Sequence, residues 1–137
     1  MTFSKRSTYG LRAMARLAKY WGDKSFSLSE ISEEEQISKK YLEQIFIKLR
    51  EAKLVESEKG KQGGYRLSRR PEEISVFEII EALEGGVIPS GCINGDGSFT
   101  CEKSFRCGVV LLLAEIQIEV IKILKKKTLK DVERMHR

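Results

Sequence analysis

The sequence predicts a mainly α-helical fold that includes one small β-hairpin. Three observations predict this class. Apolar residues recur at three- and four-residue steps in several segments before residue 85, two strand-like segments flank a glycine-rich turn at residues 59–64, and a longer apolar stripe of helical period begins at residue 108. With 137 residues, the chain has the length of one typical domain. A compact module followed by one long helix is therefore expected.

The first helix is predicted over residues 7–21. Apolar side chains recur at helical spacing from Leu11 to Ala18, which is typical of an amphipathic helix that buries one face. We expect Ser7 or Thr8 to cap its start, because a hydroxyl there can accept a hydrogen bond from an unpaired backbone N–H.

Two shorter helices are predicted next. Ser27 or Ser29 is expected to cap the first of them, because acidic residues fall in its early turns, where the helix dipole favours them, and it ends near Gln36. Ser38 is expected to cap the second. Two short helices joined by a tight turn form a candidate helix-turn-helix. The apolar stripe of the second helix contains Tyr41, Leu42, Ile45, Phe46 and Leu49.

A β-hairpin is predicted after these helices, with strands at residues 54–58 and 65–68. The turn between them contains three glycines, which supply the positive φ angles that tight hairpins need. A hairpin directly after a helix-turn-helix is the order of a winged helix-turn-helix. Its basic residues, which give it a positive tip, are Lys59, Lys61, Arg66, Arg69 and Arg70.

The remaining segments predict two more helices and a terminal one. A fourth helix is expected over residues 75–84, ended by two glycines, and a long helix over residues 108–127. A helix of that length with a broad apolar stripe most simply buries it against a second copy of itself, although packing back onto the first helix is the alternative, and both can hold. A short terminal helix could begin at Thr128.

Three cysteines, Cys92, Cys101 and Cys107, fall in the loop at residues 85–107, which is rich in glycine. Thiolates are soft ligands that select zinc, copper or iron–sulfur centres. The odd number of cysteines and the lack of an export signal disfavour a disulfide framework. Metal or cluster ligation is therefore the favoured interpretation, and inert or redox-reactive thiols are the alternative.

The composition limits the possible classes of function. Lysine and arginine number 25 against 20 aspartates and glutamates, a moderate positive bias. No signal-peptide core and no apolar run of membrane-spanning length are found, so a soluble cytoplasmic protein that does not associate with a membrane is expected. An enzyme is disfavoured, because no nucleophile has a paired base. The glycines at residues 60–64 join two strands and therefore do not form a dinucleotide-binding turn.

Five segments together resemble a known family: residues 9–14, 37–46 and 49–52, the glycine-rich hairpin at 60–67, and the cysteine loop. On these residues the chain is similar to the Rrf2 family of bacterial winged-helix transcription regulators, which includes the iron–sulfur cluster regulator and the nitric-oxide-sensing repressor. The resemblance covers nearly the whole chain.

The resemblance implies three functional regions. Residues 1–84 would form the winged helix-turn-helix DNA-binding domain, residues 85–107 a cluster-binding loop, and residues 108–137 the dimerisation helix and C-terminal tail. The protein would be a homodimeric repressor that binds a palindromic operator in double-stranded DNA. A [2Fe-2S] or [4Fe-4S] iron–sulfur cluster held by Cys92, Cys101 and Cys107 would tune its DNA affinity.

The family positions that contact DNA fall on the second helix of the helix-turn-helix and on the wing. Glu43 could accept a hydrogen bond from cytosine and Gln44 could pair with adenine, whereas the lysines would contact the DNA backbone. Each exposed lysine could equally be a solvated surface charge, and core packing is favoured for Tyr41. The residues are Ser38, Lys39, Lys40, Tyr41, Glu43, Gln44, Lys59, Lys61 and Arg66.

A fourth cluster ligand is not evident in the sequence. Relatives use a histidine three residues after the last cysteine or an N-terminal aspartate from the other subunit, where this chain has Val110 and Thr8. His136 is expected to lie in a frayed tail. The other candidates are a carboxylate such as Asp96, Glu102 or Glu115, a hydroxyl, or an exogenous small ligand.

Two further interpretations remain open. A winged-helix regulator could sense through free thiols or a bound zinc without any iron–sulfur centre. Alternatively it could respond to a metabolite or a protein partner, as some family members do that lack the cysteines altogether, although the intact set of three cysteines in this chain disfavours that.

Overall fold

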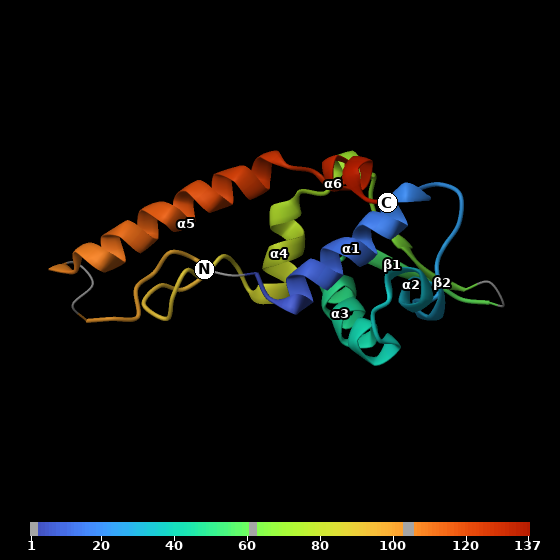
Figure 1. Ribbon diagram of the computed structural model, residues 1–137, viewed down its shortest axis with the longest axis horizontal. Helices are drawn as coiled ribbons and strands as arrows, with labels where there is room; N and C mark the ends of the chain where they lie inside the picture. The colour runs from blue at the N-terminus through green and yellow to red at the C-terminus, as the bar shows by residue number, and fades with distance from the viewer. Residues whose placement is uncertain (1–2, 61–62, 103–105) are drawn as a thin grey trace.

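The computed structural model describes residues 3–60, 63–102 and 106–137 and confirms a mainly helical fold with one hairpin (Figure 1). Two antiparallel strands pair with Val55 opposite Leu67 and Glu58 opposite Gly64. In chain order the elements are α1 (Lys5–Lys19), α2 (Leu28–Glu35), α3 (Lys39–Glu51), β1 (Val55–Glu58), β2 (Gly64–Leu67), the 3-10 turn η1 (Pro71–Glu73), α4 (Val76–Glu84), α5 (Gly108–Lys126) and α6 (Leu129–Met135).

Most helix starts lie where the capping residues predict them. Ser27 caps α2 and exchanges hydrogen bonds with Glu30 in a capping box, and Ser38 and Thr128 cap α3 and α6. The predicted start of α1 is wrong. Ser4, not Ser7 or Thr8, caps that helix by accepting from the Ser7 N–H, whereas the Ser7 side chain is buried; both serine hydroxyls donate to the Glu84 carboxylate.

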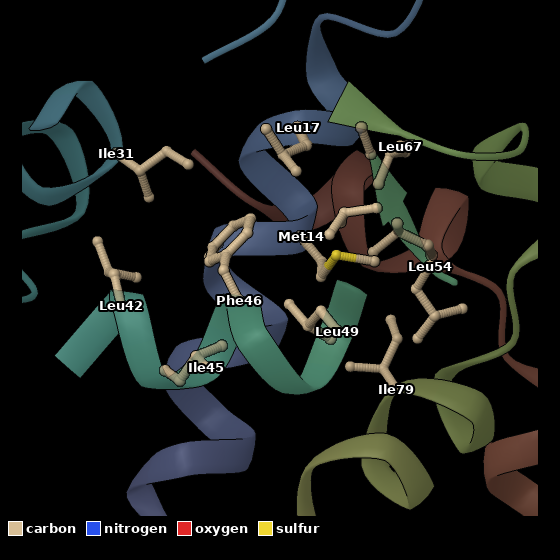
Figure 2. Packing of buried hydrophobic residues seen from close by; sticks show 14 of the residues in the cluster. Met14, Leu17, Ile31, Leu42, Ile45, Phe46, Leu49, Leu54, Leu67 and Ile79 are labelled. Carbon is tan, nitrogen blue, oxygen red and sulfur yellow. The ribbon is translucent and has the colours of Figure 1, made fainter. Parts of the chain in front are cut away.

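The main hydrophobic core lies between α1, α3, α4 and the hairpin (Figure 2). Met14 and Leu17 of α1 face Phe46 and Leu49 of α3 there, and all four side chains are buried. Leu129 of α6 is fully buried in the same cluster, so the segment after α5 returns to pack against α1. The apolar stripes predicted for the first and third helices are therefore the stripes that form the core, with Tyr41 as a partly buried neighbour.

The base of the wing is fixed to the segment before α2. Phe26 and Tyr65 exchange both backbone hydrogen bonds, at 2.9 and 2.7 Å. Gly64 is required at this crossing, because a Cβ atom there would overlap the carbonyl oxygen of Phe26. The wing consequently has a set direction relative to the helix-turn-helix.

The long helix α5 extends away from the other helices and packs mainly on α4 (Figure 1). Only Val110 and Gln117 of this helix are buried. No helix in the described ranges has the length and apolar character that crossing a membrane requires. Large apolar side chains of α5 remain exposed, namely Val109, Leu111, Leu112, Ile116, Ile118 and Ile123.

Candidate DNA-binding surface and cysteine loop

The outer face of α3 is exposed and mostly polar, with Ile47 as a large apolar side chain that is 57% exposed. Gln36 adopts the left-handed conformation, with φ of 58°, and so turns the chain between α2 and α3. Ser38 then accepts a hydrogen bond from the Tyr41 N–H at 3.1 Å. Because the apolar stripe of α3 faces the core, the opposite face points outward. That face gathers the predicted residues Ser38, Lys39, Lys40, Glu43 and Gln44, all exposed.

Tyr41 is half-buried and braces α3 against α1. Its ring meets the Tyr9 ring edge-on, with centroids 5.6 Å apart. The guanidinium of Arg12 lies over the Tyr9 ring, 5.5 Å from its centroid. Tyr41 is thus placed between the core and the exposed face, and packing accounts for much of its surface, as expected.

A buried carboxylate, that of Glu35 at the end of α2, joins α2 to α1. The Glu35 side chain is 3% exposed and accepts from Arg16 at 2.6 Å, while Arg12 pairs with its other oxygen at 3.2 Å and also donates to the Glu35 backbone carbonyl. Burial raises the pKa of Glu35, but hydrogen bonds from His136 and Arg16 outweigh burial and leave the pKa below its ordinary value. Glu35 is therefore charged in the folded protein.

His136 lies against this carboxylate, 2.9 Å from a Glu35 oxygen. The expectation that it lies in a frayed tail is wrong, because its side chain is largely buried between α6 and the helix-turn-helix. The signal for Glu35 was weak in the sequence, since acidic residues at the end of a helix are usually solvated. Its pairing with arginines on α1 and a histidine beyond α6 depends on contacts distant in sequence.

The wing residues are placed differently from one another. Lys59 is exposed at the tip, and Lys61 lies outside the described residues. Arg66 is exposed, and it pairs with Glu58 at 2.9 Å and with Glu56 at 3.4 Å. Side chains alternate along a strand, and the neighbouring Tyr65 packs on Phe46 of α3, so Arg66 points to the opposite face of the wing. Two carboxylates therefore partly neutralise Arg66.

The cysteine loop contains a small hairpin. Ile93 bridges to Phe99, and the Thr100 N–H donates to the Cys92 carbonyl at 3.0 Å. This pairing sets Cys92 opposite Thr100, the residue before Cys101, so these two cysteines lie on the two arms of the hairpin. Asp96 closes the turn by accepting from the Ser98 hydroxyl and N–H at 2.6 and 2.8 Å, and these hydrogen bonds lower the pKa of Asp96.

Cys107 is the residue directly before α5 and occupies its N-cap position. All three thiols are free, with Cys101 exposed and the other two partly exposed.

This donor set fits a soft metal or an iron–sulfur cluster in its chemistry. In residues 3–60, 63–102 and 106–137, however, no three His, Cys, Asp or Glu side chains converge as a metal site. The three thiols thus do not lie together as one metal site. Of the expected fourth ligands, Asp96 is engaged by Ser98, and Glu102 and Glu115 are exposed.

The comparison with known proteins agrees with this architecture. The profile of the Rrf2 family, described as iron-dependent transcriptional regulator, matches residues 3–134. The HTH-type transcriptional regulator IscR of Aliivibrio salmonicida is 38% identical over 78% of this chain, and the match spans 62% of that regulator's length.

Two solved structures are similar over almost the whole chain. The structure of CymR, the global cysteine regulator of Bacillus subtilis, superimposes with a TM-score of 0.80 at 32% identity, covering 100% of this chain and 99% of that one. The structure of T. potens IscR gives a TM-score of 0.75 at 32% identity, covering 98% of this chain and 87% of that one.

Proposed function

Because the chain belongs to the Rrf2 family of transcriptional regulators, we propose that it binds a palindromic operator in double-stranded DNA as a homodimer and represses transcription. The observation that carries this proposal is the exposed polar face of α3 beside a wing of fixed direction. In helix-turn-helix dimers, two such helices enter successive major grooves about 34 Å apart. Such a protein acts where the chromosome lies, which makes the cytoplasm its expected location.

Individual residues can be assigned roles on this proposal. Glu43 and Gln44 are placed to read base edges, because a carboxylate accepts from cytosine N4 and an amide pairs with adenine. Lys39 and Lys40 at the start of α3 would contact phosphates, as would Lys59 and Lys61 of the wing. Arg66 would first have to leave its two carboxylate partners, so we expect it to contribute less than an unpaired arginine.

The dimer is supported by the exposed apolar face of α5. Val109, Leu112, Ile116 and Ile123 recur at three-, four- and seven-residue steps and so lie on one side of the helix. Contiguous apolar surface of this kind on a small protein marks an association site. A second copy is the occupant we propose, because two such helices can cover each other about a twofold axis.

Replacing Gln44 by alanine is expected to weaken binding to the preferred operator about tenfold, because a good bidentate base contact discriminates by about 1–3 kcal/mol. The operator can be selected from random duplexes and binding followed by fluorescence anisotropy. Preference at one symmetric pair of base positions should relax. Equal losses on all duplexes would contradict a base-reading role.

Lys40→Ala provides the contrasting control for this experiment. A residue that contacts phosphate should weaken binding to every duplex about equally and reduce the slope of log affinity against log salt by about one. A wild-type protein whose affinity hardly changes with salt would contradict the DNA-binding proposal itself.

We further propose that an iron–sulfur cluster held by Cys92, Cys101 and Cys107 modulates the DNA affinity. When bound, such a cluster supplies a centre sensitive to oxygen, nitric oxide or iron supply. Cys92 and Cys101 lie on the two arms of one hairpin, and Cys107 would join them from the start of α5. The loop and the first turn of α5 would then be ordered together.

A second candidate is sensing through the thiols alone. It is supported by the three thiols not lying together as one site and by the structural similarity to a cysteine regulator. The exposed Cys101 and the partly exposed Cys92 and Cys107 could then respond as accessible thiols, with or without zinc.

Anaerobic purification should separate the two candidates. With a cluster, the protein should be brown and contain iron and sulfide, and Cys101→Ala should lose both, because two remaining thiolates hold a cluster poorly. The iron, the sulfide and the visible spectrum are the measurements. Equal cluster content in Cys101→Ala would contradict ligation by this residue. A wild-type protein that stays colourless after reconstitution, but whose DNA affinity changes on thiol oxidation, would favour the second candidate.

A further inference from the structure

Gln117 is an unusual residue for its place in α5. Most of this helix is exposed, yet the side chain of Gln117 lies in its middle and is 3% exposed. A buried amide is costly unless its hydrogen-bonding groups are used. Its Nε2 donates to the carbonyl oxygen of Val87 at 2.7 Å and to that of Asn94 at 2.8 Å.

Both acceptors belong to the cysteine loop. Asn94 lies two residues after Cys92 in the small hairpin, and Val87 lies near the start of the loop, where its side chain is buried with Val76 and Ile80 of α4. One side chain of α5 thus joins two parts of the loop. Figure 1 shows the loop running beside α5 over much of the length of the helix.

The backbone of the loop is closely packed near the residues that accept from Gln117. Gly95 approaches the backbone of Gly85 so closely that a Cβ atom at position 95 would overlap the Gly85 carbonyl oxygen. Ile93 is buried as well, so the inner side of the hairpin is packed while Cys101 is exposed. Only the short packed segment from Cys92 to Asn94 therefore separates the first cysteine from the hydrogen bond to α5.

We propose that Gln117 couples the state of the cysteine loop to the position of α5, and through α5 to the spacing of the two recognition helices. The proposal rests on the proposed function and names the residue through which its regulation acts. The Gln117 amide donates hydrogen bonds to the loop, while the exposed apolar side chains of α5 would contact the second copy. Gln117 is a positioning residue, because it touches backbone carbonyls and no cysteine.

The test compares Gln117→Met with Lys122→Met. Methionine has nearly the length of glutamine but no donor, so Gln117→Met removes both hydrogen bonds to the loop. Lys122 is exposed on the same helix and pairs only at the surface with Glu119, so Lys122→Met makes the same new side chain without touching the loop.

The first measurement is loop mobility in the protein without added metal. Amide hydrogen exchange across the hairpin and alkylation of Cys92 by N-ethylmaleimide should become about tenfold faster in Gln117→Met, because opening the loop no longer breaks two hydrogen bonds. Both rates should stay at the wild-type level in Lys122→Met. Unchanged rates in Gln117→Met would overturn the proposal whatever the cysteines bind.

The second measurement is the ratio of operator affinities between two loop states. The states are the protein before and after anaerobic reconstitution with iron and sulfide or, if no cluster forms, reduced and diamide-treated protein. Allosteric couplings commonly change affinity by a factor of about 5–150. We expect a ratio of about tenfold or more in the wild type and in Lys122→Met, falling to within about twofold of one in Gln117→Met.

The outcomes separate the two proposals. A wild-type ratio of one would defeat the sensing part of the proposed function, and with it the coupling role of Gln117. A wild-type ratio that persists unchanged in Gln117→Met would leave the sensor intact and overturn only the inference about this residue.

Discussion

Glu35→Gln is expected to lower the free energy of unfolding by about 3 kcal/mol, because it removes the one buried negative charge that Arg16 and Arg12 both contact. Arg16, itself largely buried, would lose its short contact with the Glu35 carboxylate. The His136 contact would be altered at the same time. Urea unfolding followed by circular dichroism measures the change.

Glu34→Gln is the matched control for this prediction. Glu34 also pairs with Arg16, at 3.2 Å, but 42% of its side chain is exposed. An exposed pair contributes little, so we expect a change below about 1 kcal/mol. Equal losses in the two variants would show that burial of Glu35 is not what makes its ion pairs important.

The pH dependence of the Glu35→Gln effect follows from the lowered pKa of Glu35. A carboxylate whose folded pKa lies below its ordinary value of 4.5 stabilises the fold above that value, and the contribution is lost as the pH falls through the folded pKa. The stability difference between wild type and Glu35→Gln should therefore be full near pH 7 and shrink in acid. A difference that grows in acid would contradict the assignment of a charged Glu35.

Introducing lysine at both Leu112 and Ile116 is expected to convert the protein to a monomer. These side chains lie four residues apart on one exposed face of α5, where two buried charges from each copy would meet in the proposed dimer. Affinity for the palindromic operator should fall by about a hundredfold or more, because the second half-site is no longer held at a high effective concentration. Sedimentation equilibrium and anisotropy measure the two effects.

Lys122→Glu changes charge at an exposed polar position of the same helix and should leave both the dimer and the operator affinity nearly unchanged. A double lysine variant that still sediments as a dimer would mean that the apolar face of α5 is not the association surface.

The sequence was sufficient to predict the elements whose boundaries are set by local chemistry. Ser27, Ser38 and Ser75 begin helices because their side chains meet backbone N–H groups only three residues ahead. The start of α1 was misplaced for the opposite reason. Ser7 and Ser4 are both adequate caps by residue type, and what separates them is that the Ser7 side chain is buried against residues far along the chain, among them Glu84.

The same limit applies to the candidate functional residues. The clustering of the cysteines predicts metal or cluster ligation, which stays a prediction, but it does not reveal the hairpin that pairs Cys92 with Thr100. A stripe of apolar residues in α5 could be read from the sequence, but periodicity does not say which chain covers it. Gln117 escaped notice and His136 was misplaced, because a polar residue signals burial only through its partners, and theirs are remote in sequence.

The hairpin that pairs Cys92 with Thr100 also bears on how easily the loop can respond. Bringing two arms of a flexible chain together costs closure entropy that rises with the length between them, and here folding has already met that cost for the arms that carry Cys92 and Cys101. On the proposed function, binding a soft ion would therefore require less further ordering of the chain than binding to an open loop, and the ordering that remains would bring the three thiols together.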